Sequence, residues 1–284
     1  MTSKIKGSSG ASLQFLIDDT ENKIVRKTCH NEKSKRLLVQ AEKQRSFNKN
    51  IFKVPEIFRI TQEEDSTILE MSFIDGSDMV SYTCYSELQE FIVLTEKIID
   101  FLSLEIQESC VQKFPMNTWM TKVNSLIETD AVKKKVSLSF LKDCSTALIE
   151  NLPERIHIGK CHGDLTFSNM LVMENNIYLI DFLDPPIETP YEDISKIMID
   201  CRYFWTLQKY SEECDKTKVK ILWEHIGRRI EQRLSCVVEF SIIKKFQLLG
   251  LLRILPYTSD VNEIKLIVNS MKDVMNDIDI TLCR

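Results

Sequence analysis

The chain has 284 residues, of which 43% are hydrophobic and 28% are charged, and its formal net charge is −5. These values are ordinary for a globular protein with one large domain or two lobes. The mild acidity gives no basic face for nucleic acid, and no stretch approaches the roughly 20 apolar residues that cross a bilayer. We therefore expect neither nucleic acid nor a membrane among its partners.

The cysteines indicate a reducing compartment. There are nine, an odd number, and none shows the CxxC or Cys/His spacing of a zinc site. Residues 1–6 lead into Gly and Ser, not into the apolar core of a signal peptide. Together these features predict free thiols and a cytoplasmic protein.

A cluster of small residues separates two short apolar segments within residues 4–17, as a strand-turn-strand unit requires. Gly7 and Gly10 let the backbone approach a ligand closely. The hydroxyls of Ser8 and Ser9, with backbone N–H groups, can meet phosphate oxygens. A plain flexible turn has the same composition, so both interpretations stay open for this segment.

Residues 23–28 alternate as a strand, in which Lys27 shares a face with the apolar Val25. A partly buried lysine of this kind can reach phosphate groups, whereas a solvated edge lysine is the alternative. Arg26 is the competing candidate, because a one-residue shift in register exchanges the two faces. Residues 31–48 then show the periodicity of a helix.

Two further strands are predicted at residues 51–60 and 67–73, on either side of an acidic turn. The second strand runs into a glycine turn at Gly76, and we place a boundary between two lobes near residue 75. Apolar residues then recur at intervals of three and four over 86–151, which predicts helices. The segment from residue 194 to the end is also helical in pattern.

Two short runs of β-branched, aliphatic and aromatic residues at 171–172 and 177–180 predict a β-hairpin. Asn175 and Asn176 lie between them and suit a tight turn. Such a hairpin brings the chain before its first strand close to the chain after its second strand.

Three oxygen-bearing side chains flank this hairpin. Asp164 and Asn169 precede it and Asp181 ends it, so all three can face one small volume. Hard oxygen ligands of this kind suit Mg²⁺, which binds through one or two carboxylates plus substrate phosphates.

The motif at residues 162–164, His-Gly-Asp, is followed by Asn169 and, 12 positions later, by Asp181. This pattern resembles the catalytic loop and metal-binding segment of aminoglycoside phosphotransferases and choline-kinase-like enzymes, which are small-molecule kinases with a protein-kinase-like fold. Gly163 replaces the Arg of the ordinary protein-kinase loop, and Leu183 stands where Asp-Phe-Gly has its Gly. Both departures favour the small-molecule branch.

The resemblance implies a bilobal α+β fold, with a small β-rich nucleotide-binding lobe over residues 1–75 and a larger, mostly helical catalytic and acceptor-binding lobe over 76–284. It implies transfer of the γ-phosphoryl group of ATP or GTP to a hydroxyl of a small polar molecule, such as a sugar, an amino alcohol or an aminoglycoside. The nucleotide and this acceptor are the expected partners, and Mg²⁺ is the expected cofactor.

The resemblance also implies roles for residues of the motif. Asp164 would accept or orient the proton of the acceptor hydroxyl, while Asn169 and Asp181 hold Mg²⁺. His162 is expected to support the loop, with a role as a base as the bolder alternative. Asp193 matches the aspartate that begins a helix and ties down the catalytic loop.

On the nucleotide side, the resemblance makes residues 7–10 a phosphate loop and Lys27 the residue that neutralises phosphate charge. Glu42, in the middle of the next helix, would hold that lysine in place. Glu70 and Phe73 lie where the hinge would meet the adenine.

Three rival functions remain open. A nucleotide-binding pseudokinase would keep this scaffold without transferring phosphate. A protein kinase is disfavoured because the segment from Asp181 to Asp193 is short and Ala-Pro-Glu is absent. A His/Asp metal phosphohydrolase would need further ligands, and the chain has only four His.

Overall fold

The computed structural model describes the backbone of residues 4–6, 11–17, 21–47, 50–210 and 213–282. The proposed phosphate loop, with Gly7, Ser8, Ser9 and Gly10, lies outside the described residues.

The chain forms two compact units. The first comprises residues 1–97 and 167–184, and the second comprises the remainder. A single boundary at residue 75 does not describe this division, because residues 167–184, which contain the predicted hairpin, belong to the first unit together with residues 76–97. The first unit carries most of the strands and the second is mostly helical, which confirms the α+β class.

The first unit is built on an antiparallel sheet with the strand order β1-β2-β3-β5-β4. Its strands are β1 (Lys4–Lys6), β2 (Ser12–Ile17), β3 (Lys23–His30), β4 (Ile57–Gln62) and β5 (Ser66–Ser72). The strand expected from residue 51 begins only at Ile57. Pro55 lies before it, and a proline has no N–H to donate to a ladder.

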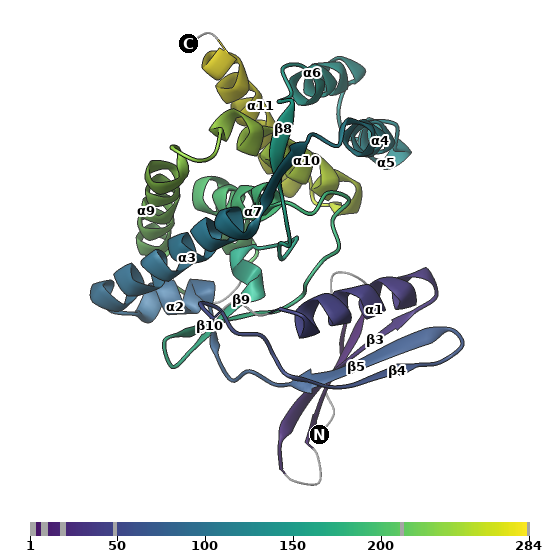
Figure 1. Cartoon of the computed structure of the whole chain (residues 1–284), viewed down its shortest axis with the longest axis vertical. Coiled ribbons are helices and arrows are strands. Elements are labelled where there is room, and N and C mark those ends of the chain that lie inside the picture. The colour runs from purple at the N-terminus through teal and green to yellow at the C-terminus, as the bar shows by residue number, and fades with distance from the viewer. Residues whose placement is uncertain (1–3, 7–10, 18–20, 48–49, 211–212, 283–284) are drawn as a thin grey trace. The chain divides into compact units, whose positions relative to one another are not determined.

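Helix α1 (Glu32–Arg45) lies alongside β3 and β5 (Figure 1) and buries Leu37 and Ala41 against the sheet. Their partners are alternate residues of the strands, which share one face because the side-chain period of a strand is two. The buried cluster consists of Ala11, Cys29, Leu37, Ala41, Leu69 and Met71. Lys27 stands on this same face, opposite Leu13 on β2 and Leu69 on β5.

A second sheet in this unit has the order β10-β9-β6. Its strands are β6 (Ser77–Asp78), β9 (Met170–Met173) and β10 (Asn176–Leu179), and the neighbouring helices are α2 (Met79–Tyr85), α3 (Leu88–Glu108) and η1 (Phe167–Asn169). Gly76 permits the close approach of β6 to β9, since a Cβ atom there would lie 2.9 Å from the backbone oxygen of Val172.

The hairpin turn between β9 and β10 differs from the predicted one by a residue. Met173 pairs with Asn176, so the two turn residues are Glu174 and Asn175. Both have positive φ angles, of 49° and 60°, as a type I′ turn requires. Asn176 belongs to the strand, and its side chain donates a hydrogen bond to the Glu174 carbonyl.

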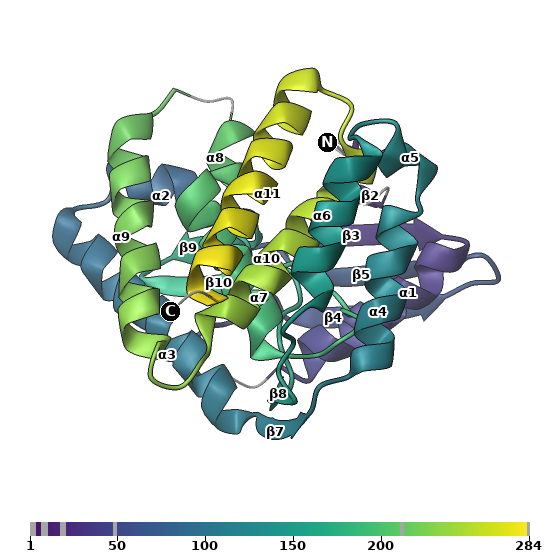
Figure 2. The same cartoon turned by 90° about the horizontal axis from the view of Figure 1, so that it is seen from above.

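The second unit is organised around α7 (Pro190–Tyr203), which is buried over nearly its whole length. Helix α10 (Phe240–Ile254) packs against both α7 and α11 (Val261–Leu282), as Figure 2 shows. The remaining helices are α4 (Met116–Ile127), α5 (Asp130–Lys133), α6 (Leu138–Ile149), α8 (Trp205–Gln208), α9 (Lys216–Leu234) and η2 (Leu255–Tyr257).

One part of the region predicted as helical is a β-ribbon. Strand β7 (Cys110–Lys113) follows α3 and pairs antiparallel with β8 (Arg155–Ile158). The partner strand lies more than 40 residues further along the chain, so local periodicity gives no sign of it.

Two further structural features concern the helices and the cysteines. Within the part of the chain that the structure describes, no helix is both long enough and apolar enough to cross a membrane. None of the eight described cysteines forms a disulfide.

Candidate active site

The loop that carries Asp164 is held through its backbone by Asp193, in the first turn of α7. The carboxylate of Asp193 accepts hydrogen bonds from the backbone N–H groups of His162, at 2.5 Å, and of Gly163, at 2.7 Å. Gly163 has a φ angle of 88°, which a residue with a side chain rarely adopts. A glycine at this position therefore lets two successive N–H groups meet one carboxylate, and the expected supporting role of Asp193 is confirmed.

His162 is fully buried beneath the same loop. Its Nδ1 accepts a hydrogen bond from the backbone N–H of Asp164, at 3.2 Å. A buried ring that fixes its neighbour's backbone supports the loop, and this geometry favours that role over a role as a proton-transferring base.

Asp164 lies beside a cation that the sequence analysis did not identify. Its Oδ1 is 3.3 Å from the Nζ of Lys196, and 30% of the Asp164 side chain is exposed. Burial acts to raise the pKa of this carboxyl, but the charges of Lys196, Arg253 and His162, with a hydrogen bond from Lys196, hold the pKa below its ordinary value. Asp164 is therefore ionised at neutral pH.

Lys196 did leave a signal in the sequence. It follows Asp193 by three residues on a predicted helix, and residues at this spacing share a helix face. A lysine on the face that ties down the catalytic loop is therefore a candidate neighbour of that loop.

The hairpin places Asn169 and Asp181 at one end of its two strands. Asn169 is the last residue of η1, and its carbonyl accepts a hydrogen bond from the N–H of Ile180 at 3.1 Å. Asp181 is the next residue after Ile180. It has a φ angle of 58°, a left-handed conformation that Asp tolerates better than most residues. Such an outlier motivates a functional hypothesis for Asp181.

Lys27 points toward Asp181. Its Nζ lies 2.8 Å from Oδ1 of Asp181, and only 10% of its side chain is exposed. Arg26 faces the other side of the sheet, where it pairs with Glu70 on β5 at 2.6 Å. This register makes Lys27, and not Arg26, the neighbour of Asp181.

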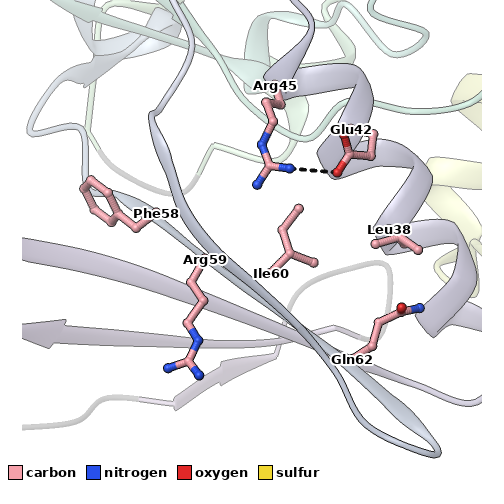
Figure 3. Close-up of a pocket in the computed structure, with 7 residues that line it drawn as sticks. All are labelled: Leu38, Glu42, Arg45, Phe58, Arg59, Ile60 and Gln62. Carbon is pink, nitrogen blue, oxygen red and sulfur yellow. Dashed lines mark hydrogen bonds and ion pairs between the residues drawn. The ribbon is translucent and has the colours of Figure 1, made fainter.

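Glu42 does not hold Lys27 in this structure. It lies on the exposed side of α1 and pairs with Arg45, 2.8 Å away (Figure 3). The buried side of the helix is instead formed by Leu37, Ala41 and Gln44, and Glu42 is rotated away from it by one residue.

Glu42 also lines a surface hollow of about 480 Å³ between α1 and β4 (Figure 3). The lining residues are Leu38, Glu42, Arg45, Phe58, Arg59, Ile60 and Gln62. Neither Lys27 nor Asp181 belongs to this set, so the hollow is separate from the candidate site.

The end of α1 contacts the Asp181 segment by other means. The Nζ of Lys43 donates a hydrogen bond to the carbonyl of Leu183 at 2.8 Å. The ring of Phe47 packs edge-on against Phe182, with the ring centroids 5.4 Å apart. Helix α1 is therefore coupled to this segment through Lys43 and Phe47.

The two hinge candidates lie on different faces of the sheet. Glu70 is committed to Arg26 on the face opposite Lys27, so its side chain does not point to the Lys27 side. Phe73 packs edge-on against Phe15, with centroids 5.6 Å apart. Of the two side chains, only that of Phe73 packs with a residue of the Lys27 face.

The donor set at the hairpin suits a hard cation that shares its ligands with phosphate. Among the described residues, no group of three or more His, Cys, Asp or Glu could hold a metal ion by itself. One carboxylate and one amide, with Lys27 close by, match the way in which Mg²⁺ is held jointly by protein and substrate phosphates.

The chain has the protein-kinase-like fold of the aminoglycoside phosphotransferases. A thermostable mutant of aminoglycoside phosphotransferase APH(4)-Ia, in its apo form, matches with a TM-score of 0.62 at 13% identity, over 98% of this chain and 94% of that one. Amicoumacin kinase hAmiN in complex with AMP-PNP, Ca²⁺ and Ami gives 0.59 at 12%, over 97% and 88%. The streptomycin–ATP–APH(2″)-IIa ternary complex gives 0.57 at 13%, over 96% and 91%. At these identities the likeness shows the fold alone.

No family model matches the chain. Over 83 residues it is 35% identical to the KEOPS complex subunit Bud32 of Pyrococcus abyssi (strain GE5 / Orsay). That match covers 27% of this chain and 37% of the relative, so the chain spans little more than a third of the length of the curated protein it matches.

Proposed function

We propose that this chain is a small-molecule kinase, which transfers the γ-phosphoryl group of ATP or GTP to a hydroxyl of a small polar acceptor. The observation that carries the proposal is the ion pair between Lys27 and Asp181. These residues are 154 positions apart, and the sequence pattern assigned one to the nucleotide and the other to the metal. Their meeting supports both assignments.

Asp181 and Asn169 would hold Mg²⁺, which when bound neutralises charge on the transferring phosphate. Asp181 is suited to this task because 53% of its side chain is exposed. Lys27 would then turn from Asp181 toward phosphate oxygens, as an ammonium group on a flexible stem can do.

Asp164 would orient the acceptor hydroxyl. A carboxyl with a lowered pKa is a weak base, but it stays ionised and accepts a hydrogen bond from the hydroxyl. Strong basicity is not required, because positioning and charge stabilisation supply most of the catalysis in phosphoryl transfer. His162 and Asp193 would keep this carboxylate in place through the loop backbone.

The acceptor would be a sugar, an amino alcohol or an aminoglycoside. Enzymes of the same fold include proteins named for action on aminoglycosides and on amicoumacin. The absence of disulfides among the described cysteines is compatible with a reducing cytoplasm as the place of the reaction.

One observation favours a second function, that of a nucleotide-binding pseudokinase. Glu42 pairs with Arg45 and not with Lys27, so the glutamate–lysine pair that active kinases require is not formed. A chain of this kind would bind nucleotide without transferring phosphate.

A nucleotide-consumption screen separates the two functions. Wild-type protein with ATP or GTP and Mg²⁺ is tested against panels of sugars, amino alcohols and aminoglycosides, and nucleotide binding is measured in parallel by calorimetry. We expect acceptor-dependent release of ADP or GDP that chelation of Mg²⁺ abolishes. Binding without transfer across the whole panel would favour the pseudokinase, and no binding would contradict both.

A further inference from the structure

Helix α7 carries a buried lysine, Lys196, that contacts the carboxylate of Asp164 in the catalytic loop. The Nζ of Lys196 is 3.3 Å from Oδ1 of Asp164, and 7% of the lysine side chain is exposed. Asp193, one turn earlier on the same helix, already binds the loop backbone. One helix therefore fixes both the backbone of this loop and its acidic side chain.

Helix α10 packs close to this lysine at Gly250. A Cβ atom at Gly250 would lie 3.8 Å from the Nζ of Lys196 and 3.3 Å from Cδ1 of Ile199. A glycine inside a helix is destabilising relative to alanine, so its presence in the buried α10 has a packing reason. The missing side chain relieves a tight contact with Ile199, and the end of Lys196 lies at ordinary van der Waals distance from the same position.

Helix α10 contributes a second cation to this region, Arg253, which pairs with a different carboxylate. Arg253, one turn after Gly250, pairs with Glu192 of α7 at 3.0 Å. The positive charge of Arg253 is therefore largely compensated by that carboxylate. Lys196 is the cation that directly contacts Asp164.

We propose that Lys196 is a positioning residue for phosphoryl transfer, which holds the Asp164 carboxylate in one orientation. This inference rests on the proposed kinase function. An ion pair formed in advance restricts the rotation of the carboxylate, so less freedom is lost when the acceptor hydroxyl arrives. Lys196 acts through Asp164 and need not touch either substrate.

The first test compares Lys196→Met with wild type and with Lys196→Arg. Met keeps most of the length and the apolar stem but removes the charge. We expect kcat to fall about tenfold to a hundredfold with little change in the KM for nucleotide, and Arg to restore part of it. Lys135→Met is the matched control, because Lys135 binds the carbonyls of Leu255, Pro256 and Thr258 and pairs with no carboxylate among the described residues. It should leave kcat within about twofold of wild type.

The second test follows the protonation of Asp164 by ¹³C NMR of its carboxyl. The charged groups that act on it are Lys196 from α7, Arg253 from α10 and His162 from the loop. Removing one cation disfavours the ionised carboxylate, so Lys196→Met should raise the pKa of Asp164 and move the acidic limb of the kcat profile to higher pH. Lys135→Met should move neither.

The double variant Asp164→Asn/Lys196→Met controls for a loss of activity that is caused by unfolding. Removing one partner of a buried ion pair is strongly destabilising, whereas replacing both is often close to neutral. The double variant should therefore be more stable to urea than Asp164→Asn, and it should transfer phosphate no more slowly.

The outcomes separate this inference from the proposed function. If wild type transfers phosphate and Lys196→Met matches it in kcat and in the pKa of Asp164, the positioning role is wrong. If wild type transfers nothing, the kinase proposal and the positioning role of Lys196 in transfer both fail, while the NMR titration still tests the ion pair. If Lys196→Met alone unfolds, rescue by the double variant supports the pairing, and failure of that rescue contradicts it.

Discussion

Each unit of this protein pairs a lysine with an aspartate of the motif, but in different settings. In the first unit, Lys27 meets Asp181 at 2.8 Å, and 53% of the aspartate side chain is exposed. In the second, Lys196 meets Asp164 at 3.3 Å, and 30% of the aspartate side chain is exposed. The two lysines are similarly buried, with 10% and 7% of their side chains exposed, so the difference lies in the aspartates. The more exposed carboxylate of Asp181 can exchange partners at a lower cost than the less exposed carboxylate of Asp164.

The backbones around the two aspartates also differ, because one is strained and the other is held by side-chain contacts. Asp181 has a strained, left-handed φ angle. Asp164 lies in a loop that Asp193 and His162 hold through three backbone N–H groups. The comparison suggests that the first pair is a site where ligands replace protein contacts, and that the second is a fixed support for chemistry.

Breaking the fixed pair, Lys196 and Asp164, should have the largest effect. Asp164→Asn keeps the size of the side chain and removes its charge, so transfer should fall by about 10²–10⁴-fold, the usual contribution of such a group. Nucleotide affinity, measured by calorimetry, should stay close to wild type because this carboxylate binds no nucleotide in the proposal. A large loss of nucleotide affinity in a folded variant would contradict the separation of roles.

The second-largest effect is expected when the exchangeable pair, Lys27 and Asp181, loses its aspartate. Asp181→Asn removes the charged metal ligand, and we expect roughly a hundredfold lower transfer, since a bound metal contributes several kcal/mol. Added Mg²⁺ should restore only part of it. Asn169→Ala removes a neutral ligand and should do less damage; equal activity of Asp181→Asn and wild type at ordinary Mg²⁺ would overturn the metal assignment.

Breaking the same pair at its basic partner should weaken nucleotide binding. Lys27→Ala removes a charge-assisted contact to phosphate, which corresponds to about a tenfold or greater loss of affinity. Arg26→Ala is the matched control, because Arg26 faces Glu70 on the other side of the sheet. Calorimetry with ATP and Mg²⁺ should show the loss for Lys27→Ala only, and the reverse result would mean that the strand register is wrong.

The smallest effect is expected at Glu42. Its contact with Arg45 is an exposed pair within one helix, worth roughly 0.5 kcal/mol or less. Glu42→Gln should therefore change urea stability and transfer very little. A loss of transfer comparable to that of Lys27→Ala would show that Glu42 leaves Arg45 for Lys27 during the reaction.

Local patterns accounted for much of the nucleotide-side sheet and its helix. The alternation in residues 23–28 placed Lys27 with Val25, and the helix after that strand was expected at 31–48 and is formed by Glu32–Arg45. The error at Glu42 was one of helical phase. Leu37, Ala41 and Gln44 form the buried stripe, and Glu42 is about 100° away from Ala41 around the helix.

Contacts between distant segments could not be predicted in this way. Strand β7 forms because β8 pairs with it, and the β9–β10 turn falls at Glu174 and Asn175 because cross-strand pairing sets the register. Both features depend on partners that lie outside the local sequence window.

The sequence by itself determined the chemistry that this protein can offer, since the spacing of Asp164, Asn169 and Asp181 around a hairpin is a local property. The tertiary structure decided which cation serves each aspartate. Lys27 reaches Asp181 across 154 positions, and Lys196 reaches Asp164 from α7. A charge finds its partner through the packing of whole helices and sheets. The spacing of Asp193 and Lys196 marks the lysine as a candidate neighbour of the loop, but this local pattern does not say which side chain it meets.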